Sequence, residues 1–199
     1  MEEKTIHMLW EGDYFEAVQI SIKSFARFHN VILWSYTNQQ YIDCTLCDAN
    51  EILDFDEFDA CIGLFRSDLF RLHVINKFGG WWSDCDNFCV EKLPDLDNVV
   101  TLLNMEPKIP INNSLFTFPI NSPILLECIK SYKTTGTLGF LQFHNILSTI
   151  YNINILPFEV GCNAMIFHEK DTIVFHLGKC TSVATYIKML YLQKKYLLS

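Results

Sequence analysis

The chain has 199 residues, of which half are apolar and 14% are aromatic, with 16 phenylalanines among them. This length fits one domain with a substantial core, and this composition excludes a disordered chain. The 15 basic and 23 acidic residues give a formal net charge of −8, which disfavours nonspecific binding of nucleic acid because phosphates attract positive surfaces. We therefore expect residues 1–199 to form a single domain.

The first part of the chain alternates apolar runs with helical periodicity. Residues 5–10 are typical of a buried strand, residues 13–29 carry apolar side chains at helical spacing, and residues 31–36 are typical of a second strand. A strand, a helix and a strand within about thirty residues indicate a parallel α/β unit. Residues 37–60 are more polar and acidic, and we expect an irregular segment with short elements there.

A second helix is predicted for residues 65–78, because apolar side chains recur at helical spacing and Gly79-Gly80 then ends the pattern. Trp81-Trp82 begins a new extended segment. Later strands are predicted at 99–103, 115–118 and 173–176, and later helices near 122–133, 138–150 and 183–198. The pattern favours an α/β fold, a mixed and mostly parallel sheet flanked by helices in one domain.

The eight cysteines lack the spacing of a disulfide-rich scaffold, and no apolar signal segment follows the charged first residues. Cys44 and Cys47 have the spacing of half a zinc site, but further ligands at comparable spacing do not follow. No apolar run reaches the roughly 18–20 residues that span a bilayer. We therefore expect reduced thiols in a soluble, cytoplasmic protein without a transmembrane segment.

The motif Asp-x-Asp occurs three times, at 54–56, 84–86 and 95–97. Only Asp84 and Asp86 follow a helix, a Gly-Gly stop and an apolar strand start. This context places them at the carboxyl end of a strand, where open α/β sheets bind ligands. Carboxylates two residues apart in an extended segment project to the same side, so both can reach one divalent cation. Such a cation would stabilise the charge that grows on a departing diphosphate.

Asp68 and Arg71 lie one turn apart on the preceding predicted helix and share its face. One interpretation is a surface ion pair worth a few tenths of a kcal/mol. The other is that Asp68 accepts hydrogen bonds from sugar hydroxyls while Arg71 assists the phosphate or the sugar. We favour the second interpretation because the Gly-Gly stop and the Asp84–Asp86 pair follow.

The order Ser-Asp-x-x-Arg, helix, Gly-Gly, aromatic and Asp-x-Asp over residues 67–87 resembles the sugar-binding region of DxD-containing GT-A glycosyltransferases. The nearest groups in this resemblance are mannosyltransferases, α-1,4-galactosyltransferases and the catalytic domains of large clostridial toxins. The resemblance implies the GT-A fold, which is Rossmann-like, and a Mn²⁺ or Mg²⁺ cofactor. It also implies a nucleotide-sugar donor and transfer with retention of configuration.

The resemblance extends over residues 5–130 and implies roles for further side chains. Trp10 ends the segment that resembles the family's first strand and is a candidate for stacking on the base. Trp82 takes the aromatic position before the Asp pair, and Asn113 lies in a segment that resembles one lining the donor or acceptor side. His176 is a candidate third ligand of the metal or diphosphate, although glycine follows where relatives carry tryptophan. The alternative for His176 is a partly buried histidine at a strand end.

The resemblance thus implies catalytic roles for Asp68, Arg71, Asp84 and Asp86, with the cation on the last two. The donor is expected to be a UDP-sugar, with a GDP-sugar as the main alternative, and the acceptor could be a glycan, a lipid, a protein or a modified nucleic acid. The sequence identifies no nucleophile for a covalent intermediate, and the resemblance favours same-face attack. Two rivals stay open: a metal-dependent phosphohydrolase or nucleotidyltransferase, and a non-catalytic GT-A-like protein that binds a sugar or a partner.

The predicted helix at 183–198 combines aromatic and aliphatic residues with Lys188, Lys194 and Lys195. Such a helix either touches a membrane surface or a partner, or packs on the domain and leaves its lysines in water. The sequence alone leaves both interpretations open.

Overall fold

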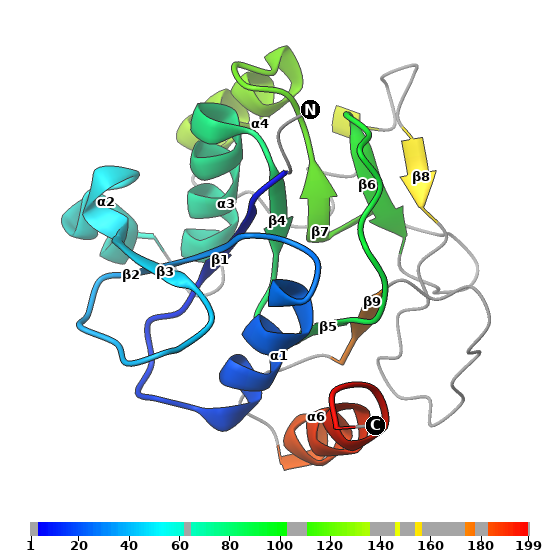
Figure 1. Ribbon diagram of the computed structural model, residues 1–199. Helices are drawn as coiled ribbons and strands as arrows, with labels where there is room; N and C mark the ends of the chain where they lie inside the picture. The colour runs from blue at the N-terminus through cyan, green and yellow to red at the C-terminus, as the bar shows by residue number, and fades with distance from the viewer. Residues whose placement is uncertain are drawn as a thin grey trace.

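The computed structural model describes residues 4–61, 65–102, 111–135, 146–147, 154–156, 174–177 and 183–198. Figure 1 shows their arrangement as helices around one central sheet. The elements, in chain order, are β1 (Ile6–Leu9), α1 (Glu16–Ala26), β2 (Val31–Ser35), β3 (Thr45–Asp48), a 3-10 turn (Ala49–Glu51), α2 (Phe55–Asp59), α3 (Phe65–Phe78), β4 (Trp81–Ser83), β5 (Asn87–Cys89), β6 (Val99–Leu102), β7 (Ile111–Thr117), α4 (Pro123–Thr135), β8 (Asn154–Leu156), β9 (Val174–His176) and α6 (Val183–Tyr196).

The central sheet has seven strands in the order β3-β2-β1-β4-β7-β6-β8. Strands β3, β2, β1 and β4 run parallel to one another. β7 is antiparallel to both β4 and β6, and β8 is parallel to β6. The sheet is therefore mixed and mostly parallel, as the sequence predicts.

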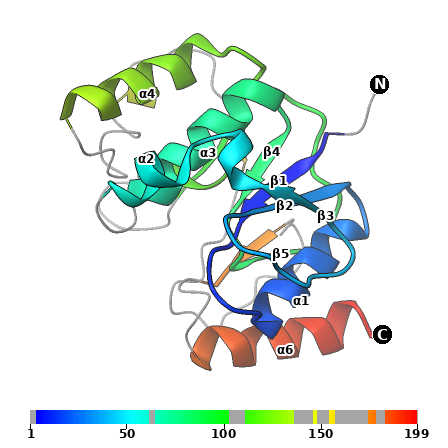
Figure 2. The same cartoon turned by 90° about the vertical axis from the view of Figure 1, so that its left-hand side faces the viewer.

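Helices cover both faces of this sheet, with α1 on one side and α3 and α4 on the other, as Figures 1 and 2 show. Because successive side chains of a strand point to opposite faces, the adjacent residues Trp81 and Trp82 enter different cores. Trp81 packs with Ile6 and Phe25 on the α1 side. Trp82 packs with Phe70 on the α3 side. The apolar strand start thus anchors β4 to both layers.

The Gly79-Gly80 pair ends α3 at Phe78, where the sequence predicts the end. Gly79 and Gly80 both adopt positive φ angles, +67° and +76°, which residues other than glycine rarely adopt. A Cβ on Gly80 would lie 2.5 Å from the carbonyl oxygen of Thr5. The glycine pair therefore lets the chain reverse closely and enter β4 beside β1, where the Trp81 amide donates to the Thr5 carbonyl at 2.8 Å.

Strands β5 and β9 form a separate, antiparallel two-stranded sheet. Phe88 of β5 and Phe175 of β9 pack with Met189 and Leu192 of α6. Helix α6 lies against α1 and runs along the underside of the molecule in Figure 2. None of the described helices is long and apolar enough to cross a membrane.

The sequence correctly places β1, α1, β2, α3, β4, β6, α4, β9 and α6, with differences of a few residues at their ends. β7 begins at Ile111, four residues before the predicted start, and pairs with both β4 and β6. Three strands were not predicted: β3, whose side chains are mostly exposed at a sheet edge, and the short β5 and β8. The predicted helix at 138–150 falls mostly outside the described residues. The expectation that residues 1–199 form a single domain stays a prediction.

Candidate active site

The strand order reverses between β1 and β4. From β1 the chain builds β2 and β3 on one side, and then crosses to place β4 on the other. In α/β sheets, ligands bind outside the carboxyl ends of strands at such a reversal, because the flanking connections leave in opposite directions. Trp10 follows β1 and Asp84 follows β4, so both predicted residues lie at this edge.

Asp84 to Asn87 form a turn rather than the extended segment that the sequence analysis assumed. The Asn87 amide donates to the Asp84 carbonyl at 3.1 Å, which closes the turn. Cys85 is buried in the core on the α1 side and its thiol donates to the Leu9 carbonyl at 3.3 Å. The predicted core position of Cys85 is confirmed, and the predicted extended geometry is wrong because β4 ends at Ser83.

The Asp84 carboxylate is held from two sides. Its Oδ1 accepts a hydrogen bond from Trp82 Nε1 at 2.8 Å and lies 3.2 Å from Nη1 of Arg71. The Asp84 amide donates to the Ser114 carbonyl of β7 at 2.8 Å. About a quarter of the side chain, 26%, remains accessible. Asp84 is therefore fixed in place and still reachable by a ligand. Asp86, in the same turn, is buried.

Asn87, which the sequence analysis did not single out, is the internal brace of this turn. It is fully buried, and its Nδ2 donates to Ser83 Oγ at 3.0 Å and to the Ser114 carbonyl at 2.8 Å. Its own carbonyl accepts from Ser21 Oγ of α1 at 2.6 Å. The turn is thereby tied to β4, β7 and α1. Asn87 directly follows the Asp-x-Asp motif, but its bracing role can be inferred only once the turn at residues 84–87 is known.

Arg71 joins the helix to the turn. Its guanidinium lies 3.3 Å from Asp68 Oδ1 and 3.2 Å from Asp84 Oδ1, and its Nη1 donates to the Asn113 carbonyl at 2.6 Å. The guanidinium also lies over the Trp82 ring, 5.2 Å from the centroid, a cation–π arrangement. Arg71 and Asp68 are only 6% and 9% exposed, so this is a buried cluster and not a surface ion pair.

Asp68 is the carboxylate that helix α3 contributes to the cluster. Asn113 Nδ2 donates to its Oδ1 at 2.9 Å, and Arg71 approaches the same oxygen. Burial raises the pKa of Asp68, while the charge of Arg71 and the amide of Asn113 act to lower it. The structure thus brings the predicted Asp68, Arg71, Asp84 and Asn113 into direct contact, from α3, the β4 turn and β7.

The charge balance of this cluster favours a cation. Asp68 and Asp84 with Arg71 carry a net formal charge of −1, the carboxylate of Asp86 in the same turn is buried, and buried charge is costly unless it is compensated. The described residues contain no group of three or more His, Cys, Asp or Glu side chains placed to hold a metal. Two carboxylates suffice for Mg²⁺ when phosphates supply further oxygens. His176 pairs with Asn87 through the backbone of β9, but its side chain lies outside the described part of the structure.

The two predicted tryptophans differ in accessibility. Trp10 directly follows β1 and is half-buried, and its Nε1 donates to the Asp13 carbonyl at 2.9 Å. Trp82 is almost completely buried; its indole holds Asp84 and carries Arg71 on its face. The geometry gives Trp82 a positioning function, and direct contact of either ring with a donor stays a prediction.

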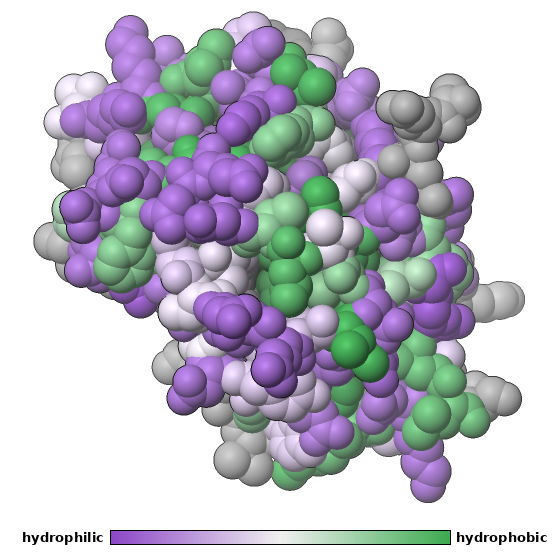
Figure 3. Space-filling view, turned by 60° about the vertical axis from the view of Figure 1, so that its left-hand side comes forward, coloured by the Kyte–Doolittle hydropathy of each residue, from purple (hydrophilic) through white to green (hydrophobic). Residues whose placement is uncertain are grey.

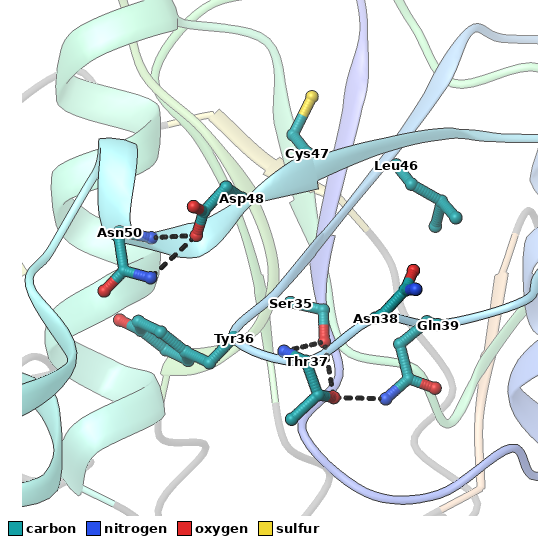
Figure 4. A pocket seen from close by; sticks show the side chains of 9 residues that line it. All are labelled: Ser35, Tyr36, Thr37, Asn38, Gln39, Leu46, Cys47, Asp48 and Asn50. Atoms are coloured by element: carbon teal, nitrogen blue, oxygen red, sulfur yellow. Dashed lines mark hydrogen bonds between the residues drawn. The ribbon is translucent and has the colours of Figure 1, made fainter.

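A pocket of about 320 Å³ lies at the carboxyl ends of β2 and β3. Figure 4 shows its polar lining: Ser35, Thr37 and Gln39 form one hydrogen-bonded row, and Asp48 accepts two hydrogen bonds from Asn50 nearby. Its full lining is Ser35, Tyr36, Thr37, Asn38, Gln39, Leu46, Cys47, Asp48 and Asn50.

This pocket adjoins the loop after β1, because Gln39 Nε2 also donates to the Gly12 carbonyl at 2.8 Å. The sequence analysis missed it by treating residues 37–60 as irregular. The available signal was a run of hydroxyl and amide side chains directly after a buried strand, which is the ligand edge of a parallel sheet.

One aspartate of each of the two other Asp-x-Asp motifs makes a structural contact. Asp54 caps the start of α2 by accepting from the Asp56 amide at 2.9 Å. Asp97 forms an ion pair with Lys4 at 2.7 Å. Of the three motifs, only the one at 84–86 joins the buried cluster at the carboxyl edge of the sheet.

Comparison with known proteins supports the fold and gives no family for the chain. No protein-family model matches it. An uncharacterized protein of Arabidopsis thaliana is 32% identical over 69 residues, which are 35% of this chain and 11% of that protein. The chain thus spans about a tenth of that relative's length.

Two solved glycosyltransferase structures resemble this fold over most or nearly all of the chain. The glycosyltransferase GlyE of Streptococcus pneumoniae TIGR4, in its apo form, aligns with a TM-score of 0.58 at 11% identity, over 98% of this chain and 64% of that one. The PaToxG glycosyltransferase aligns with a TM-score of 0.53 at 15% identity, over 74% of this chain and 68% of that one. The chain therefore has a glycosyltransferase-type fold, as the sequence predicts.

Proposed function

We propose that this protein is a divalent-metal-dependent glycosyltransferase that uses a nucleotide-sugar donor. The observation that carries the proposal is the buried cluster in which Arg71 contacts both Asp68 and Asp84. It lies at the strand-order reversal of a sheet whose fold is that of glycosyltransferases. Buried, mutually paired charges beside an open strand edge are more typical of a functional site than of a core.

The acidic turn fits a cation better than it fits a donor alone. A diphosphate would be repelled by Asp84 and Asp86, so a positive charge is needed between them. These two carboxylates would hold Mn²⁺ or Mg²⁺, and His176 is a further candidate ligand. When bound, the cation would neutralise the charge of the departing diphosphate.

The remaining residues would orient the donor. Asp68 would accept hydrogen bonds from sugar hydroxyls, and Arg71 would stabilise negative charge on the phosphate through its guanidinium. Trp82 and Asn113 would act indirectly, by positioning the residues that contact the donor. Trp82 fixes Asp84, and Asn113 fixes both Asp68 and Arg71. With Arg71 at the leaving group, same-face attack with retention of configuration is the route that we favour.

The nucleoside end of the donor would lie toward β2. Trp10 and the pocket at Ser35–Asn50 share the carboxyl edge with Asp84, and β2 is two strands from β4, roughly 10 Å at ordinary strand spacing. Hydroxyl, amide and carboxylate groups in the pocket suit a ribose and base. The resemblance in sequence favours a UDP-sugar, with a GDP-sugar next; the acceptor and an intracellular location stay predictions.

The test is release of nucleoside diphosphate from a panel of nucleotide sugars with Mn²⁺. We expect release from one donor that stops on chelation of the metal and in Asp84→Ala/Asp86→Ala. The matched control is Asp95→Ala/Asp97→Ala, which removes an exposed Asp-x-Asp from the same chain and should release at the unchanged rate. Thermal melting of each variant shows that it is folded.

The products separate the rival functions. Release of nucleoside diphosphate with free or transferred sugar supports the proposal. Release of nucleoside monophosphate or inorganic phosphate would instead establish a phosphohydrolase or nucleotidyltransferase. Calorimetric binding of Mn²⁺ and a nucleotide sugar without turnover, with any of the candidate acceptors present, would establish a non-catalytic binding protein.

A further inference from the structure

Helix α6 presents an apolar stripe to the solvent. Ile187, Leu190, Tyr191 and Lys194 recur at three- and four-residue spacing, so they share one side of the helix. Ile187 is 60% exposed, Leu190 37% and Tyr191 49%. Apolar side chains gathered in this way on a surface helix indicate an interaction surface. In Figure 3, apolar and polar side chains meet along the lower edge of the molecule, where α6 lies.

The stripe cannot turn inward, because the opposite side of α6 is fixed in the domain. Met189 and Leu192 are fully buried against Ala17 and Ile20 of α1 and Phe88 of β5. Rotating the helix to bury the stripe would expose these two residues and carry Lys194 inward with the stripe, where its charge would be costly. The exposed stripe is therefore a permanent feature of this packing.

The same helix concentrates positive charge. Three of the chain's 15 basic residues, Lys188, Lys194 and Lys195, lie within its 14 residues, and residues 183–199 include no Asp or Glu. Lys194 lies in the stripe, while Lys188 and Lys195 flank it on one side by helical spacing. In a chain with a net charge of −8, this face is a local basic surface.

We propose that the outer face of α6 docks on an anionic lipid bilayer. Lysines beside an apolar stripe can bury their methylene chains and keep their ammonium groups at the level of the headgroups. Apolar insertion and attraction to anionic lipid then add. An acidic headgroup layer is the partner whose charge complements this face in an otherwise acidic protein. The proposal does not depend on the proposed transferase activity.

The test is cosedimentation of the full chain with phosphatidylcholine vesicles that contain about one third phosphatidylserine, an anionic lipid. We expect binding at low salt that weakens strongly at about 1 M salt, where charges are screened beyond ~3 Å. Pure phosphatidylcholine vesicles should bind at least tenfold less. Lys194→Gln/Lys195→Gln should lose roughly 25-fold in affinity, about fivefold per lysine, and Ile187→Ser/Tyr191→Ser should also weaken binding.

Helix α4 supplies matched controls, because Leu126 is also exposed and Lys130 and Lys133 are exposed lysines. Leu126→Ser and Lys130→Gln/Lys133→Gln should bind the vesicles as the parent protein does. Absence of binding by the parent protein, or equal losses in the α4 and α6 variants, would overturn the proposal. A dimer in light scattering that Ile187→Ser/Tyr191→Ser converts to monomer, without vesicle binding, would assign the face to a second copy instead.

Discussion

Helix α3 has a charged cluster at its beginning and an aromatic cluster at its end. At its beginning, Arg71 lies within 3.3 Å of both Asp68 and Asp84, and all of these groups are charged side chains in a largely buried setting. At its end, Phe78 stacks on the imidazole of His7, with ring centroids 6.0 Å apart. His7 in turn stacks on Trp34 and accepts a hydrogen bond from its indole at 3.1 Å.

The two ends of α3 differ in whether the buried titratable groups beside them are charged. Burial lowers the pKa of His7 to about 4, so His7 is neutral near pH 7 and costs little in its apolar surroundings. At the other end, charge is retained by pairing, although a well-packed apolar cluster would often be at least as stable. The difference fits the proposal that the carboxyl edge of the sheet carries the chemistry, whereas the neutral, stacked His7 serves stability.

The largest effect is expected at the charged end. Asp84→Asn keeps an oxygen for the Trp82 indole but removes the negative charge, so nucleoside diphosphate release should fall on the order of 100-fold or more, the range for losing one charge-stabilising group. Thermal melting should change far less than activity. Asp97→Asn is the control, and unchanged release by Asp84→Asn would place the active site elsewhere.

At the aromatic end, Gly80→Ala should destabilise the fold by about 3 kcal/mol, from its left-handed backbone together with the overlap between Cβ and the Thr5 carbonyl. Gly79→Ala, whose nearest Cβ contact would be Cγ1 of the Ile120 side chain at 3.2 Å, should cost about 1–2 kcal/mol. Urea unfolding measures both free energies. Equal losses in the two variants would contradict the role given to the Thr5 contact.

His7 should make stability depend on pH. Because its pKa is about 4 when folded against 6.5 as the ordinary value, the unfolded chain takes up a proton first as the pH falls. The stabilising contribution is therefore complete above pH 6.5 and is lost as the pH falls toward 4. Between neutral pH and about pH 5 the loss should be about 2 kcal/mol.

His7→Gln separates this contribution from those of the other titrating groups, since glutamine can still accept the Trp34 hydrogen bond. The free energy of unfolding, measured in urea from neutral pH to about pH 5, should fall less steeply in the variant than in the parent by about 2 kcal/mol. Parallel pH profiles for the two proteins would show that His7 is not the group that titrates.

The smallest effect is expected for Asn113→Ala. It removes the amide that donates to Asp68 and should cost about 1 kcal/mol of stability, while the backbone carbonyl that accepts from Arg71 remains. Because this amide helps to lower the pKa of Asp68, its loss should raise that pKa. The acid limb of the pH–rate profile should then move to higher pH. An unmoved limb would mean that Asp68 does not titrate in the reaction.

Local patterns in the sequence were sufficient for much of the fold. Helical spacing and the Gly79-Gly80 stop predict α3 to its last residue, and i,i+3 spacing places Asp68 beside Arg71. The helix and Gly-Gly before Asp84 distinguish it from the aspartates at 54–56 and 95–97. Each of these inferences depends on residues close together in the chain, where backbone geometry alone sets the distance.

Only the tertiary structure could decide the rest. The contact of Arg71 with Asp84, and that of Asn113 with Asp68, join segments 13 and 45 residues apart, and the Asn87 brace reaches Ser21 and Ser114 in two other elements. The pocket at β2 and β3 exists because two parallel strands end side by side. By itself the sequence determined which side chains could carry the chemistry. Sheet order and packing decided which of them meet, because those distances depend on how separate elements assemble.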